Sequence, residues 1–168
     1  MSTPPDSPQH VAAARGMELA LDQARQADAL GEVPVGAAIL GPDGAVLAVA
    51  HNEIETLHDP TAHAERLALT RACAGSGFAR LPAGSLLAVT LEPCAMCAGA
   101  IVLARASHLV FGALDPKTGA CGSLRDIVRD PRLNHRVDVL PRLHEQECGE
   151  LLTAFFQRRR GPGSQGCR

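Results

Sequence analysis

The chain has 168 residues, enough for one substantial hydrophobic core, and its composition gives no sign of a second domain. Its longest apolar run, residues 95–104, is too short to span a membrane, and its proline-rich start does not resemble a secretory signal. We therefore expect a soluble, cytoplasmic protein with one domain over residues 1–168. About 10–160 should be ordered, with flexible ends at 1–8 and 161–168.

The formal charge is uneven along the chain. The net charge of −2 argues against a general affinity for nucleic acid. Residues 1–65, however, hold ten acidic and two basic residues, whereas residues 66–168 hold eight acidic and fourteen basic ones. This asymmetry has two interpretations that the sequence leaves open: one face meets a polyanion, or opposite charges pair across the fold.

The first half of the chain predicts a helix, a β-hairpin and a second helix. The opening helix, Gln9–Leu30, is rich in Ala, Leu, Gln and Arg and ends at Gly31. The hairpin has strands at Val33–Leu40 and Val46–Ala50 around the Gly-Pro-Asp-Gly turn of residues 41–44. A polar connection over residues 53–60 leads to the second helix, Ala62–Ala74, which should close at Gly75.

From residue 86 onward, strands and helices alternate. We expect strands at Leu86–Thr90, His108–Ala113 and Val137–Leu140, helices at Cys94–Ala104 and Leu143–Arg160, and a loop at Asp115–Ser123. An initial hairpin followed by this alternation predicts an α/β protein, a three-layer α/β/α sandwich with a central mixed five-stranded sheet.

Two short motifs carry the chemistry. His63-Ala64-Glu65 and Cys94-Ala95-Met96-Cys97 each stand at the start of a predicted helix, where the helix dipole stabilises thiolate. One imidazole and two thiols can hold three sides of a zinc ion and leave the fourth for water, with a carboxylate beside it. Alone, the first motif is weak and the second could be a redox pair. Together they predict a hydrolytic metal site.

The remaining cysteines fit no ligand spacing. A disulfide framework would need an oxidising compartment, for which the sequence has no targeting signal. We therefore interpret them as spare thiols: Cys73, Cys121, Cys148 and Cys167.

At the two motifs the chain resembles the zinc-dependent nucleoside and nucleobase deaminases. Further stretches resemble the tRNA adenosine deaminases in particular, and the likeness runs from about residue 10 to 160. These stretches are residues 32–37, 58–65, 90–100, 110–113, 117–120, 122–124 and 134–137. The resemblance implies a cytidine deaminase-like fold, a homodimer, and conversion of adenosine to inosine at the wobble position of a tRNA anticodon, chiefly in an arginine tRNA.

The resemblance also implies roles for individual residues. His63, Cys94 and Cys97 would hold one Zn²⁺ per chain, Glu65 would move protons, and Asn52 would contact the target base. The anticodon stem-loop would meet a loop with Asp115 and Lys117 and an aromatic and basic C-terminal helix. The residues expected on that helix are Phe155, Phe156, Arg158, Arg159 and Arg160.

The chain departs from the family pattern at a few positions, and two alternatives remain. The departures, at His51, Pro116, Cys121 and Gln157, affect the choice of RNA more than the reaction. One alternative is a deaminase of a free base or nucleoside, such as guanine or a cytosine compound, which needs no arginine cluster. The other is a noncatalytic zinc module, in which Cys121 or another thiol closes the coordination sphere.

Overall fold

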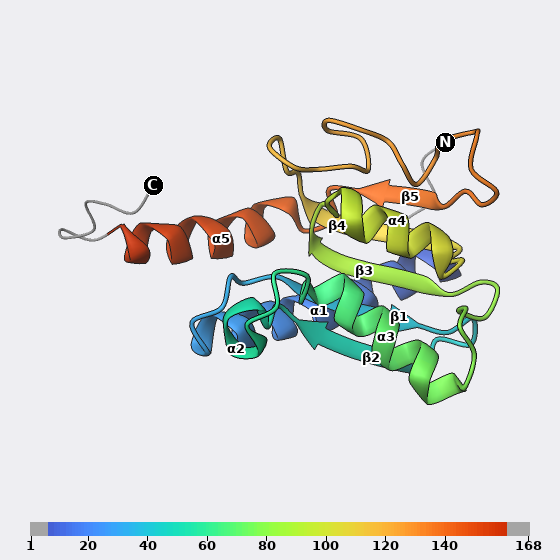
Figure 1. Cartoon of the computed structure of the whole chain (residues 1–168), viewed down its shortest axis with the longest axis horizontal. Coiled ribbons are helices and arrows are strands. Elements are labelled where there is room, and N and C mark those ends of the chain that lie inside the picture. The colour runs from blue at the N-terminus through green and yellow to red at the C-terminus, as the bar shows by residue number, and fades with distance from the viewer. Residues whose placement is uncertain (1–6, 161–168) are drawn as a thin grey trace.

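A computed structural model describes residues 7–160, which form one five-stranded mixed sheet covered by helices on both faces (Figure 1). The spatial order of the strands is β2-β1-β3-β4-β5. β1 pairs antiparallel with β2 and β3, whereas β3, β4 and β5 run parallel. The strands are β1 Gly36–Leu40, β2 Val46–His51, β3 Leu86–Leu91, β4 His108–Ala113 and β5 Asp138–Pro141. The predicted fold class is confirmed.

Helix α1, Pro8–Ala29, packs on one face of the sheet. The side chain of Ser7 caps its N-terminus, and Leu30 is its C-cap residue. Gly31 follows with a φ of 78°. The buried stripe of α1 consists mainly of small residues, so its backbone lies very close to β1. A Cβ atom at Gly36 would lie 2.0 Å from the carbonyl oxygen of Ala20, so only glycine fits there.

The opposite face of the sheet carries α3, Ala64–Ser76, and α4, Ala95–Leu103 (Figure 1). Ile39, Leu87, Leu109 and Phe111 are almost fully buried beneath these helices. The alternate residues Leu86, Ala88 and Val110 point to the α1 face, because successive strand residues face opposite sides. The C-terminal helix is α5, Glu145–Arg159. The first half of α5 packs against the sheet on the face that carries α1, and the helix then projects beyond the sheet (Figure 1).

Several predicted boundaries shift for local reasons. The first strand begins at Gly36 instead of Val33, because Pro34 has no N–H for the ladder. The second helix begins at Ala64 and passes Gly75, ending at Gly77, whose φ of 73° suits a helix end. The connection before it contains a four-residue helix, α2, Ile54–Leu57, which the sequence did not predict.

The topology gathers the segments that carry the motifs at one edge of the sheet. The carboxyl ends of β3 and β4 meet there, because these strands are parallel. The start of β1 and the end of β2 lie at the same edge, because β1 is antiparallel to both of its neighbours. Asn52, His63, Cys94 and Asp115 follow or border these ends.

Three features concern sequence expectations outside this edge. Residues 1–6 and 161–168, which cover most of the expected flexible ends, lie outside the described residues. Within residues 7–160, no helix combines the length and apolar character that crossing a membrane requires. The five cysteines in this range, which exclude Cys167, are all free.

Candidate metal centre and active-site pocket

The predicted ligands come together at the N-termini of α3 and α4. His63 and Cys94 are the N-cap residues of these helices, with extended backbones, and Cys97 lies in the first turn of α4. The His63 Nδ1 atom is 3.6 Å from the Sγ atom of Cys94 and 3.6 Å from that of Cys97. Within residues 7–160, these three form the only group of three metal-binding side chains at ligand spacing.

The donor geometry fits a tetrahedral zinc ion. Zn–S bonds of about 2.3 Å and Zn–N bonds of about 2.05 Å at a tetrahedral angle separate nitrogen from sulfur by about 3.6 Å. Both nitrogen–sulfur distances in the structure equal this value. The thiol of Cys121 does not belong to the donor group, so the described residues offer three ligands and leave one position for another molecule.

The ligands also interact electrostatically. Hydrogen bonds from Cys97 and His63 lower the pKa of the Cys94 thiol to about 4. The same hydrogen bond to Cys94, together with burial, raises the pKa of Cys97, and the hydrogen bond to Cys94 raises that of His63. In the absence of a cation, loss of a proton is therefore easier than usual at Cys94 and harder than usual at Cys97 and His63. A bound cation would compete with the protons of these groups.

Glu65 lies beside the ligands and is 4% exposed. It occupies the first turn of α3, two residues after His63. Burial raises the pKa of its carboxyl group, which makes proton uptake easier than in water. Because Glu65 is outside the group of metal-binding donors, its carboxylate can exchange protons with a reactant.

Asn52 is fixed at the end of β2 and is 6% exposed. Its Oδ1 atom accepts a hydrogen bond from the backbone N–H of Ala64, 3.1 Å away. This contact fixes the orientation of the side-chain amide, because the Oδ1 atom and not the NH₂ group faces the backbone N–H. The start of α3 therefore brings together the His63 imidazole, the Glu65 carboxylate and the Asn52 amide.

His63, Cys94, Glu65 and Asn52 line one small cavity of about 90 Å³. Its lining residues come from all the segments at the carboxyl edge of the sheet. They are Val33, Val35, Asn52, His63, Glu65, Leu91, Glu92, Cys94, Asp115 and Thr118.

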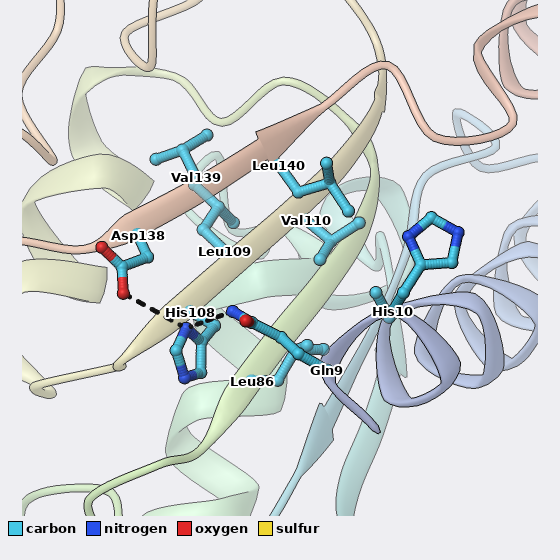
Figure 2. Close-up of a pocket in the computed structure, with 10 residues that line it drawn as sticks. Gln9, His10, Leu86, His108, Leu109, Val110, Asp138, Val139 and Leu140 are labelled. Atoms are coloured by element: carbon cyan, nitrogen blue, oxygen red, sulfur yellow. Dashed lines mark hydrogen bonds and ion pairs between the residues drawn. The ribbon is translucent and has the colours of Figure 1, made fainter. Parts of the chain in front are cut away.

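A second hollow, of about 350 Å³, is larger but lies elsewhere (Figure 2). It opens on the α1 face of the sheet, beside β4 and β5. His108 lies there between Gln9, whose Nε2 atom is 3.0 Å from His108 Nδ1, and Asp138, whose Oδ2 atom is 3.6 Å from the same nitrogen. None of the predicted site residues lines this hollow.

The residues expected to contact RNA have different surroundings. Asp115 borders the cavity, and Lys117, two residues further on, is exposed. On α5, Phe155 is 3% exposed, whereas Phe156 is 39% exposed. Phe155 therefore supports the fold, and Phe156 is the aromatic side chain of α5 that solvent reaches.

The basic residues of α5 contact the end of α1. Arg158 forms an ion pair with Asp28, and Arg159 donates a hydrogen bond to the carbonyl oxygen of Gly31 and covers the ring of Phe155. Arg66 and Arg71 similarly pair with acidic residues from the first part of the chain. Some of the charge asymmetry is thus paired across the fold.

Two buried carboxylates border this region without having been assigned a role from the sequence. Glu32, 1% exposed, accepts hydrogen bonds from the backbone N–H groups of Glu55 and Thr56. Glu92, 2% exposed, accepts hydrogen bonds from the loop that follows β4. Burial raises their pKa, but these hydrogen bonds outweigh it, and both lie below the ordinary value. A charged residue directly after a buried strand is the sequence signal that marks Glu92.

Known proteins match the chain over most of its length. The profile of the cytidine and deoxycytidylate deaminase zinc-binding region matches residues 11–113. The tRNA-specific adenosine deaminase of Bacillus subtilis is 47% identical over 141 residues, 84% of this chain and 86% of the relative. That of Aquifex aeolicus is 45% identical and covers 86% of this chain and 93% of the relative.

Solved structures extend the comparison. One comes from a study of A-to-I editing by tRNA:A34 deaminases at the wobble position of transfer RNA. It is 46% identical, with a TM-score of 0.78, and covers 82% of this chain and 99% of that one. A guanine deaminase from Bacillus subtilis is 27% identical, with a TM-score of 0.57, over 90% of this chain and 96% of that one.

Proposed function

Because the chain belongs to the zinc-binding cytidine and deoxycytidylate deaminase family, and within it to the tRNA-specific adenosine deaminases, we propose that it converts adenosine to inosine at the wobble position of a tRNA anticodon. The observation that carries this proposal is the cavity that His63 and Cys94, two members of the metal-binding group, line together with a buried carboxylate and an oriented amide. An arginine tRNA is the chief substrate that we expect.

We propose that His63, Cys94 and Cys97 hold one Zn²⁺ per chain. The spacing of the donors and the zinc-binding character of the family support this assignment. When bound, zinc supplies a Lewis acid that makes water acidic enough to act as a nucleophile near neutral pH. The third thiol that a closed structural site would need is absent from the donor group of the described residues, which disfavours a noncatalytic module.

Glu65 moves the protons of the reaction. It takes a proton from the attacking water and delivers it to N1 of adenine as the oxygen adds to C6. It then transfers the second proton to the amino group, so that the C6–N bond breaks and ammonia leaves. Water and adenosine thereby give inosine and ammonia. Its raised pKa suits a group that must both accept and donate a proton.

Asn52 holds the base, and the surrounding walls exclude water. Its side-chain NH₂ group, oriented by the N–H of Ala64, donates toward a ring nitrogen of the purine. Val33 and Val35 supply an apolar wall against which a flat base can pack. An anticodon base reaches such a cavity at low cost, because it is already unpaired.

The anticodon arm lies, in this proposal, between the loop after β4 and α5. Lys117 and the arginines of α5 provide positive charge, and Phe156 provides an exposed ring for stacking. Phe155 contributes indirectly, because it packs beneath Phe156, with ring centroids 5.4 Å apart.

We further propose a cytoplasmic homodimer that associates through α4. The nine residues of this helix include no charged side chain. Met96 and Leu103 are 37% and 78% exposed although they are apolar, and Gly99 and Ala100 between them are half-buried. A second copy of the chain would cover this apolar surface, which lies on the helix that carries two zinc ligands.

The decisive experiment compares substrates on the purified protein. Zinc is measured per chain, and inosine formation in an anticodon stem-loop is followed beside free adenosine, guanine and cytidine. We expect about one zinc ion per chain, and we expect the protein to deaminate the stem-loop but none of the three free compounds. Because the guanine deaminase fold is similar, guanine turnover without RNA editing would instead establish the free-base alternative.

A further inference from the structure

Glu92 is a buried charge that the proposed reaction does not use. It follows β3 directly and precedes the ligand Cys94 by two residues. It is 2% exposed, and the ion pairs formed by residues 7–160 do not include it. A buried carboxylate without a cation is stabilised by hydrogen bonds, so its hydrogen-bond partners show which segment of the chain it holds in place.

All its partners lie in one loop. Oε1 accepts hydrogen bonds from the backbone N–H groups of Cys121, at 3.1 Å, and Ser123, at 2.9 Å. Oε2 accepts one from the N–H of Asp115, at 3.1 Å, and one from the hydroxyl group of Ser123. A single carboxylate therefore holds both ends of the Asp115–Ser123 loop.

The same loop is pressed against the segment that carries the metal ligands. The N–H of Ala120 donates to the carbonyl oxygen of Pro93 at 2.9 Å, and Gly119 forms a β-bridge with Cys94. A Cβ atom at Gly119 would lie 2.5 Å from the carboxylate of Glu92. The loop backbone and the carboxylate are thus in direct contact, with no room for a side chain between them.

The beginning of this loop forms a wall of the active-site cavity. Asp115 and Thr118 line the cavity together with Asn52 and Glu65. The Oδ1 atom of Asp115 accepts hydrogen bonds from the N–H groups of Lys117 and Thr118, at 2.9 and 3.1 Å, so these residues form one tight turn. The position of this turn depends on the hydrogen bond between the N–H of Asp115 and Glu92.

We propose that Glu92 is a positioning residue, which fixes the Asp115–Thr118 wall relative to Cys94 and thereby sets where the target base lies against the metal centre. The inference rests on the proposed function for its consequence in the reaction. It acts through the loop and touches neither the base nor the attacking water.

The donor pattern requires a carboxylate at this position. All three backbone partners are N–H groups, which only donate. A glutamine would retain one oxygen and present an NH₂ group in place of the other. With the NH₂ group at the Oε2 position, the hydroxyl of Ser123 can turn to accept, but the N–H of Asp115 loses its acceptor. Glu92→Gln should therefore loosen the cavity wall while the fold persists.

The test combines kinetics with amide hydrogen exchange on the zinc-loaded, full-length protein. For Glu92→Gln, we expect kcat/KM for an anticodon stem-loop to fall about 10- to 100-fold, the scale that follows from misplacing a reactant by about 1 Å. Zinc per chain should stay unchanged. Exchange at the Asp115 amide should become at least about tenfold faster.

Two further variants separate positioning from a general loss of stability. Gly119→Ala leaves Glu92 intact, but its Cβ would lie 2.5 Å from both the Glu92 carboxylate and the carbonyl oxygen of Asp115, so it displaces the loop and should reproduce the loss of kcat/KM. This variant also serves if Glu92→Gln does not fold. Ile39→Val removes a buried methyl group in β1, opposite Leu87 at the start of β3 and so toward the other end of the sheet, and should keep kcat/KM within about twofold of the parent while lowering stability.

Each outcome decides the inference. Unchanged exchange at the Asp115 amide in Glu92→Gln overturns it, and so does faster exchange with an unaltered kcat/KM. If the parent protein forms no inosine but Glu92→Gln still accelerates loop exchange, the proposed function fails and Glu92 remains the residue that orders the wall.

Discussion

Replacement of Glu65 tests the proposed chemistry most directly. Glu65→Gln keeps the size of a side chain that is 4% exposed, so it creates no cavity, but it removes the group that takes up and releases protons. General acid–base catalysis contributes about 10²- to 10⁴-fold to a rate. Because Glu65 acts in two proton transfers, we expect the single-turnover rate of inosine formation to fall by about 10⁴-fold.

The same substitution has an opposite effect on stability. Burial raises the pKa of Glu65, so between its unfolded and folded pKa values the native state binds more protons than the unfolded state. Stability then decreases as pH rises through that interval, because the buried carboxyl group must ionise. A neutral amide removes this cost. Metal-free Glu65→Gln should therefore unfold at the same or a higher temperature than the metal-free parent at pH 7.

The assay measures three quantities on the same preparation: zinc per chain, thermal unfolding, and inosine in an anticodon stem-loop. Glu65→Ala should also retain zinc, because Glu65 is not a ligand, and exposed Glu18→Gln on α1 serves as the control with full activity. A Glu65→Gln enzyme that retains more than about a tenth of the parental rate would refute the assigned role. Loss of zinc in this variant would show that the carboxylate supports the metal instead.

Three further predictions concern other parts of the molecule. Glu32→Gln should lower the free energy of unfolding by about 2 kcal/mol at pH 7, because it weakens two charged hydrogen bonds to α2. Hydrogen bonds depress the pKa of Glu32 despite its burial, so the stability that Glu32 contributes is present above about pH 4.3 and is lost as the pH falls further. In urea titrations between pH 6 and pH 3, the free energy of unfolding should therefore change less for the variant than for the parent. Leu103→Glu on the α4 surface should weaken dimerisation at least about tenfold in sedimentation experiments. Val11→Glu, at a residue that is 60% exposed on α1, should leave dimerisation unchanged, and equal effects of the two variants would contradict the proposed interface. Phe155→Ala should lower the free energy of unfolding by about 3 kcal/mol, because the Phe155 ring is buried. Phe156→Ala should leave the fold stable and weaken stem-loop binding about tenfold, because the Phe156 ring is exposed; the reverse pattern would contradict these assignments.

The fold class and the metal cluster could be predicted from the sequence because both depend on local patterns. The alternation of strands and helices can be recognised from short stretches of neighbouring residues, and so can the spacing of Cys94 and Cys97. His63 lies 31 residues before Cys94, yet the two meet because each caps a helix that begins at the same edge of the sheet. The roles of Glu65 and Asn52 in the reaction stay predictions that the proposed experiments test.

Contacts between distant segments were not predictable in the same way. Nothing local shows that Arg158 pairs with Asp28 or that Phe155, but not Phe156, turns toward the core, because both depend on how α5 packs beside α1. Helix α2 was missed because four residues carry little periodicity of their own, and Glu32, more than twenty residues earlier, satisfies its first N–H groups.

By itself, the sequence determined the order of the strands and of the longer helices, the three side chains that form the His/Cys/Cys cluster, and the family, since these reside in residue types and short spacings. Only the tertiary structure decided which acidic residues are buried and what they hold. Glu92 is one carboxylate among many in the printed sequence, and its importance arises because packing removes it from water and presents it with donors from a single loop. Burial is a property of the assembled fold, because it depends on which surfaces meet.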